Sequence, residues 1–451
     1  MVAKDLRLVV LLLCWTLSLE ARRCCVAWNA NNQPNPHRRV EVNGDGATLN
    51  NNKRLTGLSR RSWGQLIISS TVPLWGPLTA RGVETTSKPT LAVEALAPGV
   101  TAPEAGRTYF PTLTPPFFQR ATYRYNLGRN AWAFEQILTF ANVTATIRCT
   151  VVKLESTGGL WVHSPQYPTG ELLQLLGDLN CPIEHVVLPC NALEHKAPMQ
   201  AFLSKFPRAQ VWVSPGQYGP FGSCGQSREG DVRMGYHVDG ILGSDVPPWA
   251  NEFDIATLYV DIPQNAGPVS EVAFCHRPTQ TLVATDAVVY IPPSPSDIYT
   301  TYFDRATVYD DPTFWPRTVL QAVFLPLRTN DDGSYPGFAA LQGRLIRAPI
   351  LRAFADARAP EPVRKWIAEI ATWKFDRVVS SHFASPVQAT PSDVQAAFAY
   401  LQEDSPYVAS QKKDLPPITC QDWELLESIN RFIAENKLGA PAVYDYKQDC
   451  L

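Results

Sequence analysis

The stretch HVVLPCNALEHK, residues 185–196, constrains the fold of this chain more than any other segment. An apolar run from His185 to Leu188 predicts a buried strand, Pro189 ends that strand, and Asn191 is a favourable cap for a following helix. In layered α/β folds, binding sites are built at strand ends of this kind. The side chains placed at this turn are Cys190, Asn191, Glu194 and His195.

Strands and helices alternate around this stretch, which predicts an α/β fold rather than an all-β fold. The pattern before residue 217 predicts strands at 147–154, 160–163, 183–188 and 210–213 and helices at 169–179 and 194–206. After residue 252 it predicts strands at 256–261, 270–276, 281–291 and 375–380 and helices at 319–324, 338–345, 362–373 and 421–435. Thr390-Pro391-Ser392-Asp393 is a typical helix start.

The composition is that of a globular protein, with 45% hydrophobic and 18% charged residues among 451. The formal net charge is −2, so no global field favours nucleic acid or an anionic membrane surface. We therefore expect no nucleic-acid partner and no transmembrane span in the mature chain.

The first 80 residues carry two stacked sorting signals. Lys4 and Arg7 precede the apolar run Val9–Leu13, which suits a signal peptide and is too short to span a membrane. Arg60-Arg61 then precedes an apolar stretch that ends at Ala80, as in a twin-arginine export signal. Two such signals resemble plastid import followed by thylakoid targeting, so we expect a chloroplast protein of the thylakoid lumen. Secretion is the alternative, with Asn142 as a glycosylation acceptor.

Ten cysteines occur without any CxxC pair, which argues against a zinc ribbon and offers no obvious disulfide framework. We expect most of them to be small buried apolar groups.

Polar side chains follow three predicted strands, and a metal site needs ligands that converge from different strands. The candidates are Glu194, His195, Asp286 and His382. Histidine with carboxylate suits a Zn, Fe or Mn ion, which would lower the pKa of a bound water molecule. A purely structural role is open for each residue, because Asn191 and Glu194 have the spacing of a capping box. His276 and His163 are weaker candidates, and we expect no role for His185 or His237.

Several longer segments resemble a plastid and cyanobacterial domain of unknown function within or near the metallo-β-lactamase superfamily. These segments are LWVHSPQYPT, VVLPCNALEHK, FPRAQVWVSPGQ, HRPTQTLVATDAVVYIPP and WKFDRVVSSHF. The resemblance covers residues 125–405. It implies a metallo-β-lactamase-like αββα four-layer sandwich with the site at one edge of the two sheets.

The chain departs from the superfamily's His-x-His-x-Asp-His pattern. Cys190 and Ala192 stand where two ligand histidines belong, Glu194 replaces the aspartate, and His195 keeps the last histidine. Asp286 stands at the bridging acid and His382 near the final histidine, while the intermediate histidine has only His276 as a candidate. The resemblance thus implies at most one ion, held by His195, Asp286 and His382, with Glu194 as a ligand or catalytic base.

Two functions follow from these residues. The first is a mononuclear metal-dependent hydrolase of unknown substrate, and the second is a catalytically silent protein that binds a small molecule or a partner protein. The superfamily also hosts redox chemistry, and a fold alone does not decide among these. The expected organisation is a targeting region at 1–80, a linker and arm at 81–124, the sandwich domain at 125–405 with an insertion at about 292–360, and a helical extension at 406–451.

Overall fold

The computed structural model describes residues 93–95, 113–114, 120–140, 143–217, 236–262, 267–401, 418–437 and 439–443. The predicted sorting signals in residues 1–80 and the acceptor Asn142 lie outside these residues. All described residues belong to one compact unit.

The first sheet starts with antiparallel strands and continues as parallel ones from β6 to β9. This sheet holds the earlier half of the described chain. Its strand order is β1-β3-β4-β5-β6-β7-β8-β9, and β2 pairs with β4. Its strands are β1 (Val93–Ala95), β2 (Leu113–Thr114), β3 (Tyr123–Gly128), β4 (Ala131–Phe140), β5 (Val143–Lys153), β6 (Leu160–His163), β7 (Ile183–Leu188), β8 (Gln210–Val213) and β9 (Gly240–Ile241).

The second sheet has the order β10-β11-β12-β15-β16 and is antiparallel except for the pair β12 and β15. Its strands are β10 (Phe253–Ile262), β11 (Gly267–His276), β12 (Thr281–Val283), β15 (Arg377–Val379) and β16 (Val387–Gln388). A separate two-stranded sheet pairs β13 (Val289–Tyr290) with β14 (Leu345–Ile346).

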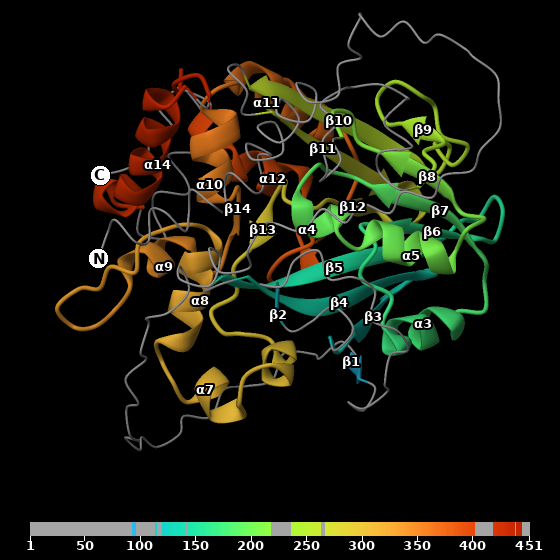
Figure 1. Ribbon diagram of the computed structural model, residues 1–451, viewed down its shortest axis with the longest axis horizontal. Coiled ribbons are helices and arrows are strands. Elements are labelled where there is room, and N and C mark those ends of the chain that lie inside the picture. The colour runs from blue at the N-terminus through green and yellow to red at the C-terminus, as the bar shows by residue number, and fades with distance from the viewer. Residues whose placement is uncertain are drawn as a thin grey trace, which may run out of the picture. The chain divides into compact units, whose positions relative to one another are not determined.

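Helices cover the outer face of each sheet (Figure 1). On the first sheet lie α3 (Gly170–Gly177), α4 (Leu193–Lys196) and α5 (Met199–Lys205). The later helices are α7 (Arg305–Tyr309), α8 (Phe314–Ala322), α9 (Pro336–Leu341), α10 (Pro349–Leu351), α11 (Pro360–Ile370), α12 (Pro391–Ala397) and α14 (Glu424–Glu435). No helix in the described ranges has both the length and the apolar character needed to cross a membrane.

Three buried clusters fill the spaces between these layers. The cluster between the two sheets is aromatic and includes Trp161, Trp212, Trp249, Phe253 and Phe274. Beneath α3 and α5, leucine and phenylalanine side chains pack on β6 and β7. On the other side, α11 packs on β10, and the indole N–H of Trp366 donates to the carbonyl of Ala256 at 3.1 Å. The layer order is therefore αββα, as the resemblance implies.

The predicted helix 194–206 is wrong as a single element, because it is divided into α4 and α5. Pro198 lies between the two helices and has no N–H with which to continue the hydrogen-bond series of α4. The short α4 consequently ends one residue after His195 and projects from the end of β7.

The predicted strand 281–291 is also wrong, because β12 ends at Val283. The backbone N–H groups of residues 285–287 donate to the side chain of Glu271 instead of to a neighbouring strand. The chain therefore turns at Asp286, and residues 289–290 pair with β14 instead. The strand β4, which the sequence did not predict, fills the first sheet in front of β5.

Four described cysteines are free: Cys149, Cys181, Cys190 and Cys275. Cys181 is half-buried and the other three are buried, which matches their expected role as small apolar groups. Cys420 is disulfide-bonded, which the spacing of the cysteines does not predict.

Candidate metal centre

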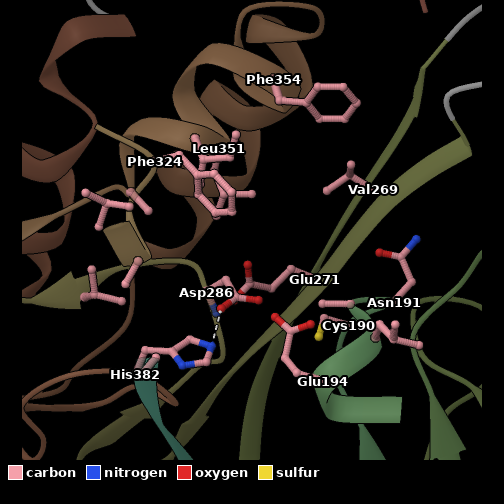
Figure 2. A pocket seen from close by; sticks show the side chains of 18 of the residues that line it. Cys190, Asn191, Glu194, Val269, Glu271, Asp286, Phe324, Leu351, Phe354 and His382 are labelled. Carbon is pink, nitrogen blue, oxygen red and sulfur yellow. Dashed lines mark hydrogen bonds and ion pairs between the residues drawn. The ribbon is translucent and has the colours of Figure 1, made fainter. Parts of the chain in front are cut away.

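The four predicted ligands lie just after three strands that end at the same edge of the structure. Glu194 and His195 lie on α4 after β7, Asp286 lies in the turn after β12, and His382 lies in the loop after β15. Figure 2 shows Glu194, Asp286 and His382 approaching one another from these separate elements. The arrangement follows from the sheets, because the parallel strands β12 and β15 deliver both of their carboxyl ends to this edge.

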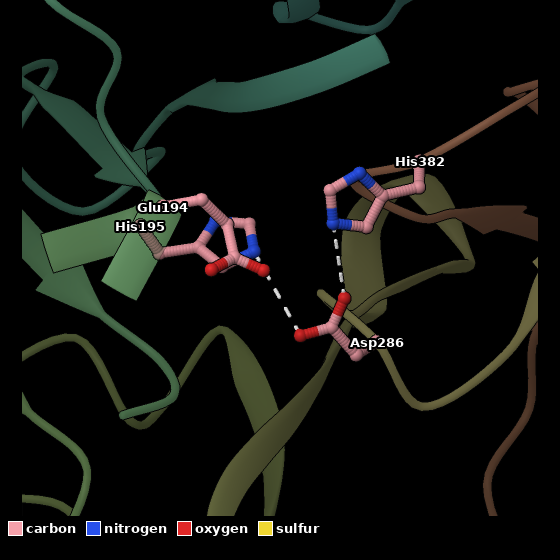
Figure 3. Close-up of side chains that lie close together, drawn as sticks. All are labelled: Glu194, His195, Asp286 and His382. Atoms are coloured by element: carbon pink, nitrogen blue, oxygen red, sulfur yellow. Dashed lines mark ion pairs between the residues drawn. The ribbon is translucent and has the colours of Figure 1, made fainter. Parts of the chain in front are cut away.

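One ligand atom from each of Glu194, His195, Asp286 and His382 lies within 4.8 Å of the others. The carboxylate of Asp286 bridges the two histidines (Figure 3). Its Oδ1 lies 3.1 Å from Nε2 of His382, and its Oδ2 lies 3.8 Å from Nε2 of His195. The predicted convergence of these side chains is thus present in the structure.

The ring of His195 is fully buried and held at one nitrogen. Its Nδ1 lies 2.6 Å from the hydroxyl of Ser164, at the end of β6, while its buried Nε2 has no hydrogen-bond partner among the described atoms. Burial lowers the pKa of His195, so the ring is neutral near pH 7. A neutral imidazole anchored at one nitrogen, with the other facing a carboxylate, is prepared to bind a metal.

His382 is anchored by the first sheet. Its Nδ1–H donates to the carbonyl of Thr146 in β5 at 2.6 Å, which directs Nε2 toward Asp286. Burial alone would lower the pKa of His382, but the hydrogen bond to Asp286, the charges of Asp286 and Glu194 and the hydrogen bond to Thr146 together raise it. Burial alone would raise the pKa of Asp286, but the same hydrogen bond and the charges of His382, His195 and Arg347 lower it to about 2.

A buried arginine, which the sequence did not single out, fixes the loop that carries His382. The guanidinium of Arg148 donates to the carbonyls of Ser380 and Phe383, the latter at 2.7 Å, and pairs with Glu135. Arg148 and Glu135 face each other across β4 and β5 and are both fully buried. This ion pair on the first sheet therefore holds the backbone on both sides of His382.

A second unpredicted pair fixes the turn at Asp286. Oε1 of Glu271 accepts hydrogen bonds from the N–H groups of Thr285, Asp286 and Ala287 at 3.2, 2.8 and 2.6 Å. Arg347 donates to the carbonyls of Asp286 and Ala287 at 3.1 and 3.2 Å. Burial and the charge of Asp286 raise the pKa of Glu271 to about 7. A glutamate within an alternating strand gives no signal in sequence of such a role.

The predicted capping box of Asn191 and Glu194 is wrong. The residue before α4 is Ala192, and no side chain caps this helix. Asn191 instead binds β11, donating to the carbonyl of Pro268 at 2.6 Å and accepting from the N–H of Ser270 at 3.2 Å. The carboxylate of Glu194 has no hydrogen-bond partner among the described residues, so capping does not explain it.

The other histidines lie outside the cluster. His276 contacts Thr279 at 2.9 Å and Glu252 at 3.8 Å at the far end of β11, so it does not supply the intermediate histidine. His163 packs between Trp161 and Phe274. His185 lies beside Trp249, and His237 is 75% exposed.

A cavity of about 270 Å³ opens beside the cluster. Glu194, Glu271, Asp286 and His382 line one part of it, and apolar side chains line the rest (Figure 2). Much of the apolar wall comes from the predicted insertion, with residues 322–324 at the end of α8 and several of residues 348–354 around α10. Nothing in the sequence of that insertion indicated a role at the site.

The donor set fits a divalent ion. Two imidazole nitrogens and two carboxylates suit zinc, iron or manganese, and the buried, unpartnered Nε2 of His195 requires a partner. Ligand atoms about 2.1 Å from one ion lie no more than about 4.2 Å apart. Both histidine contacts of Asp286 meet this limit, and the four ligand atoms all lie within 4.8 Å of one another.

Comparison with solved structures finds similar chains at low sequence identity. A metallo-β-lactamase from Pontibacter korlensis is 12% identical, with a TM-score of 0.33, and covers 63% of this chain and 100% of its own. A metal-soaked flavodiiron core from Synechocystis sp. PCC6803 is 11% identical, with a TM-score of 0.40 and a coverage of 72% of each chain. A putative diflavin flavoprotein fragment from Nostoc sp. PCC 7120 is 11% identical, with a TM-score of 0.37, and covers 65% of this chain and 97% of its own.

No curated protein matches the sequence of this chain. One family model does match it, over residues 129–313 and 322–400, which is more than half of its length. These residues include Glu194, His195, Asp286 and His382. The chain belongs to the family described as domain of unknown function DUF4336.

Proposed function

We propose that this protein is a mononuclear metal-dependent hydrolase. The observation that carries the proposal is the meeting of Glu194, His195, Asp286 and His382 from three elements, with the ligand atom of His195 buried and unpartnered. His195, Asp286 and His382 would hold one Zn, Fe or Mn ion. A divalent ion at this position polarises a carbonyl group and lowers the pKa of a water molecule.

The protein's own groups have distinct tasks in this proposal. Ser164 and the carbonyl of Thr146 orient the two imidazoles through their Nδ1 atoms. Glu194, on the cavity side, is free to accept the proton of the attacking water or to bind the ion. The missing histidines at Cys190 and Ala192 argue against a second ion.

Metal analysis tests this proposal directly. Purified protein titrated with zinc, iron or manganese should bind one ion per chain. His195→Ala, Asp286→Asn and His382→Ala should each weaken binding by at least about a hundredfold, because each removes a ligand. His276→Asn is the matched control, since it changes a buried histidine outside the cluster, and it should leave affinity unchanged. Failure of all three metals to bind would refute the hydrolase.

A catalytically silent binding protein is the second candidate. The direct contact of His382 with Asp286 favours it, because these two groups neutralise each other without an ion. Metal-free protein that retains its fold and still binds a small molecule in the cavity would support this function over the first.

We also propose the plastid, and within it the thylakoid lumen, as the location of the mature protein. The stacked signals in residues 1–80 support this proposal, as does the disulfide of Cys420, because disulfides persist in oxidising compartments. Sequencing of the mature N-terminus tests it, with a start near Arg81 expected. Glycosylation at Asn142 would instead indicate secretion.

A further inference from the structure

The cavity beside the cluster has two chemically different ends. Figure 2 shows Glu194, Asp286 and His382 at one end and Phe324, Leu351 and Phe354 away from them. Val269 of β11 completes the apolar part. The volume of about 270 Å³ lies just below the ~300–1,000 Å³ that is usual for ligand pockets, so only a small group fits.

Among its described lining residues, the cavity offers no lysine or arginine that is free to bind an anionic ligand. Arg347 is the one lysine or arginine among its described lining residues. Its guanidinium is fully used, by both oxygens of Asp356 at 3.0 Å, by Glu271 at 3.6 Å and by the carbonyls of Asp286 and Ala287. The other lining groups that can carry charge are the carboxylates of Glu194, Glu271 and Asp286 and the imidazole of His382, which already pairs with Asp286 at 3.1 Å.

A divalent ion would not reverse this balance. Two of the groups that would hold it, Glu194 and Asp286, are carboxylates, which offset the charge of the ion. The guanidinium of Arg347 remains paired with Asp356 and Glu271. An incoming carboxylate or phosphate would therefore be desolvated among like charges.

We propose that the cavity takes neutral carboxylic esters with a small apolar acyl group and excludes anionic substrates such as phosphoesters. This inference rests on the proposed hydrolase. Water adds to the carbonyl carbon, the bond from that carbon to the alcohol oxygen breaks, and Glu194 passes the proton of the water to the departing alcohol. The products are an alcohol and a carboxylic acid. The acid ionises, and the same carboxylates that exclude anions favour its release.

Binding of two probes of equal size tests the inference without any turnover. Benzamide is neutral and benzoate is anionic, and each is titrated by calorimetry into the full chain with and without one equivalent of zinc. Benzamide should bind at least about tenfold more tightly than benzoate in both forms. Equal binding, or tighter binding of benzoate, would overturn the inference.

A charge introduced into the apolar wall should reverse the preference. Leu351→Lys places an ammonium group in the cavity, so benzoate should bind more tightly than benzamide. Val269→Lys repeats the test on another element if the first variant fails to fold. Leu327→Lys is the matched control, because Leu327 is 40% exposed and does not line the cavity. If both cavity variants still bind benzamide more tightly than benzoate, the inference is contradicted.

Turnover then separates the two proposals. The zinc-loaded chain should hydrolyse 4-nitrophenyl butyrate with a kcat/KM at least about tenfold above that for 4-nitrophenyl hemisuccinate, its anionic counterpart. If the chain prefers benzamide but binds no metal, the hydrolase proposal is refuted and the proposal that the cavity selects neutral ligands stands. If the chain binds metal but does not prefer benzamide, the proposed selectivity of the cavity is refuted and the proposed metal site stands.

Discussion

Glu271 accepts the backbone N–H of Asp286 at 2.8 Å, so one buried carboxylate positions another through the main chain. The same oxygen accepts the N–H groups of Thr285 and Ala287, which ends β12 and turns the side chain of Asp286 toward the two histidines. Glu271 itself contacts no histidine of the cluster in the described structure. Its contribution is therefore to position Asp286 rather than to bind an ion.

Glu271→Gln should weaken zinc binding by about 10- to 100-fold, because groups that orient metal ligands contribute on this scale. A neutral amide accepts the three N–H groups more weakly than a carboxylate and brings N–H donors toward Arg347. Competition with a chromophoric chelator measures the affinity. Wild-type affinity in Glu271→Gln would show that Asp286 needs no such support.

Glu252→Gln is the matched control for this prediction. Glu252 is also buried, and it accepts the backbone N–H groups of Glu155 and Ser156 at 2.9 Å, but it lies beside His276, away from the cluster. The variant should lower stability and leave zinc affinity unchanged. A similar loss of affinity in both variants would point to general destabilisation.

Arg148 allows stability and positioning to be separated. Arg148→Met leaves Glu135 buried without its partner, which should cost about 3–5 kcal/mol in the free energy of unfolding. The double variant Arg148→Met with Glu135→Leu should recover most of that loss. Its zinc affinity should remain below that of the wild-type protein, because the carbonyls of Ser380 and Phe383 have lost their hydrogen-bond donor. Urea unfolding and zinc titration measure the two effects, and recovery of both would contradict the role of Arg148.

His163 should make the protein sensitive to acid. Burial lowers its pKa to about 3, and neither ring nitrogen has a hydrogen-bond partner in the described structure. Unfolded protein binds this proton below pH 6.5 and folded protein does not until about pH 3. The free energy of unfolding should therefore fall by about 1.4 kcal/mol per pH unit across this range from His163 alone.

His163→Phe should remove that contribution, because phenylalanine keeps the ring packing with Trp161 and Phe274 and has no titrating group. Chemical unfolding between pH 4 and pH 7 measures the slope. His237→Phe is the control at an exposed histidine and should keep the wild-type slope. An unaltered slope in His163→Phe would mean that His163 is not buried in its neutral form.

Local patterns predicted much of the fold. The strands at 160–163, 183–188 and 210–213 are found at their predicted positions, since apolar runs bounded by turn residues are a direct local signal. Thr390 caps α12 at the predicted helix start, and the structure adds a capping box with Asp393. The four side chains that meet in the cluster were also singled out in the sequence, because each follows a predicted buried strand.

The errors fall where distant residues decide the local structure. β12 ends at Val283 because Glu271, on another strand, takes the N–H groups that would have continued it. Arg148 and Arg347 act on loops more than 200 and about 60 residues away, so no local pattern identifies them. The apolar wall of the cavity likewise comes from an insertion whose side chains acquire a role only once it folds against β11.

Ala192 offers a gain-of-function test of the metal site. It immediately precedes α4, lines the cavity beside Glu194, and stands where the resemblance implies a ligand histidine. Ala192→His adds an imidazole next to the cluster without removing any existing ligand. Zinc affinity should therefore rise by about tenfold or more, as one more ligand joins the ion.

Ala197→His is the control, since Ala197 also lines the cavity but lies at the other end of α4. It adds the same imidazole to the same helix away from the predicted position, so zinc affinity should stay at the wild-type value. Equal tightening in both variants would mean that any added histidine near the cavity captures zinc. Tightening in Ala192→His alone would place the ion at the end of β7, because only that position combines a new ligand with Glu194, His195, Asp286 and His382.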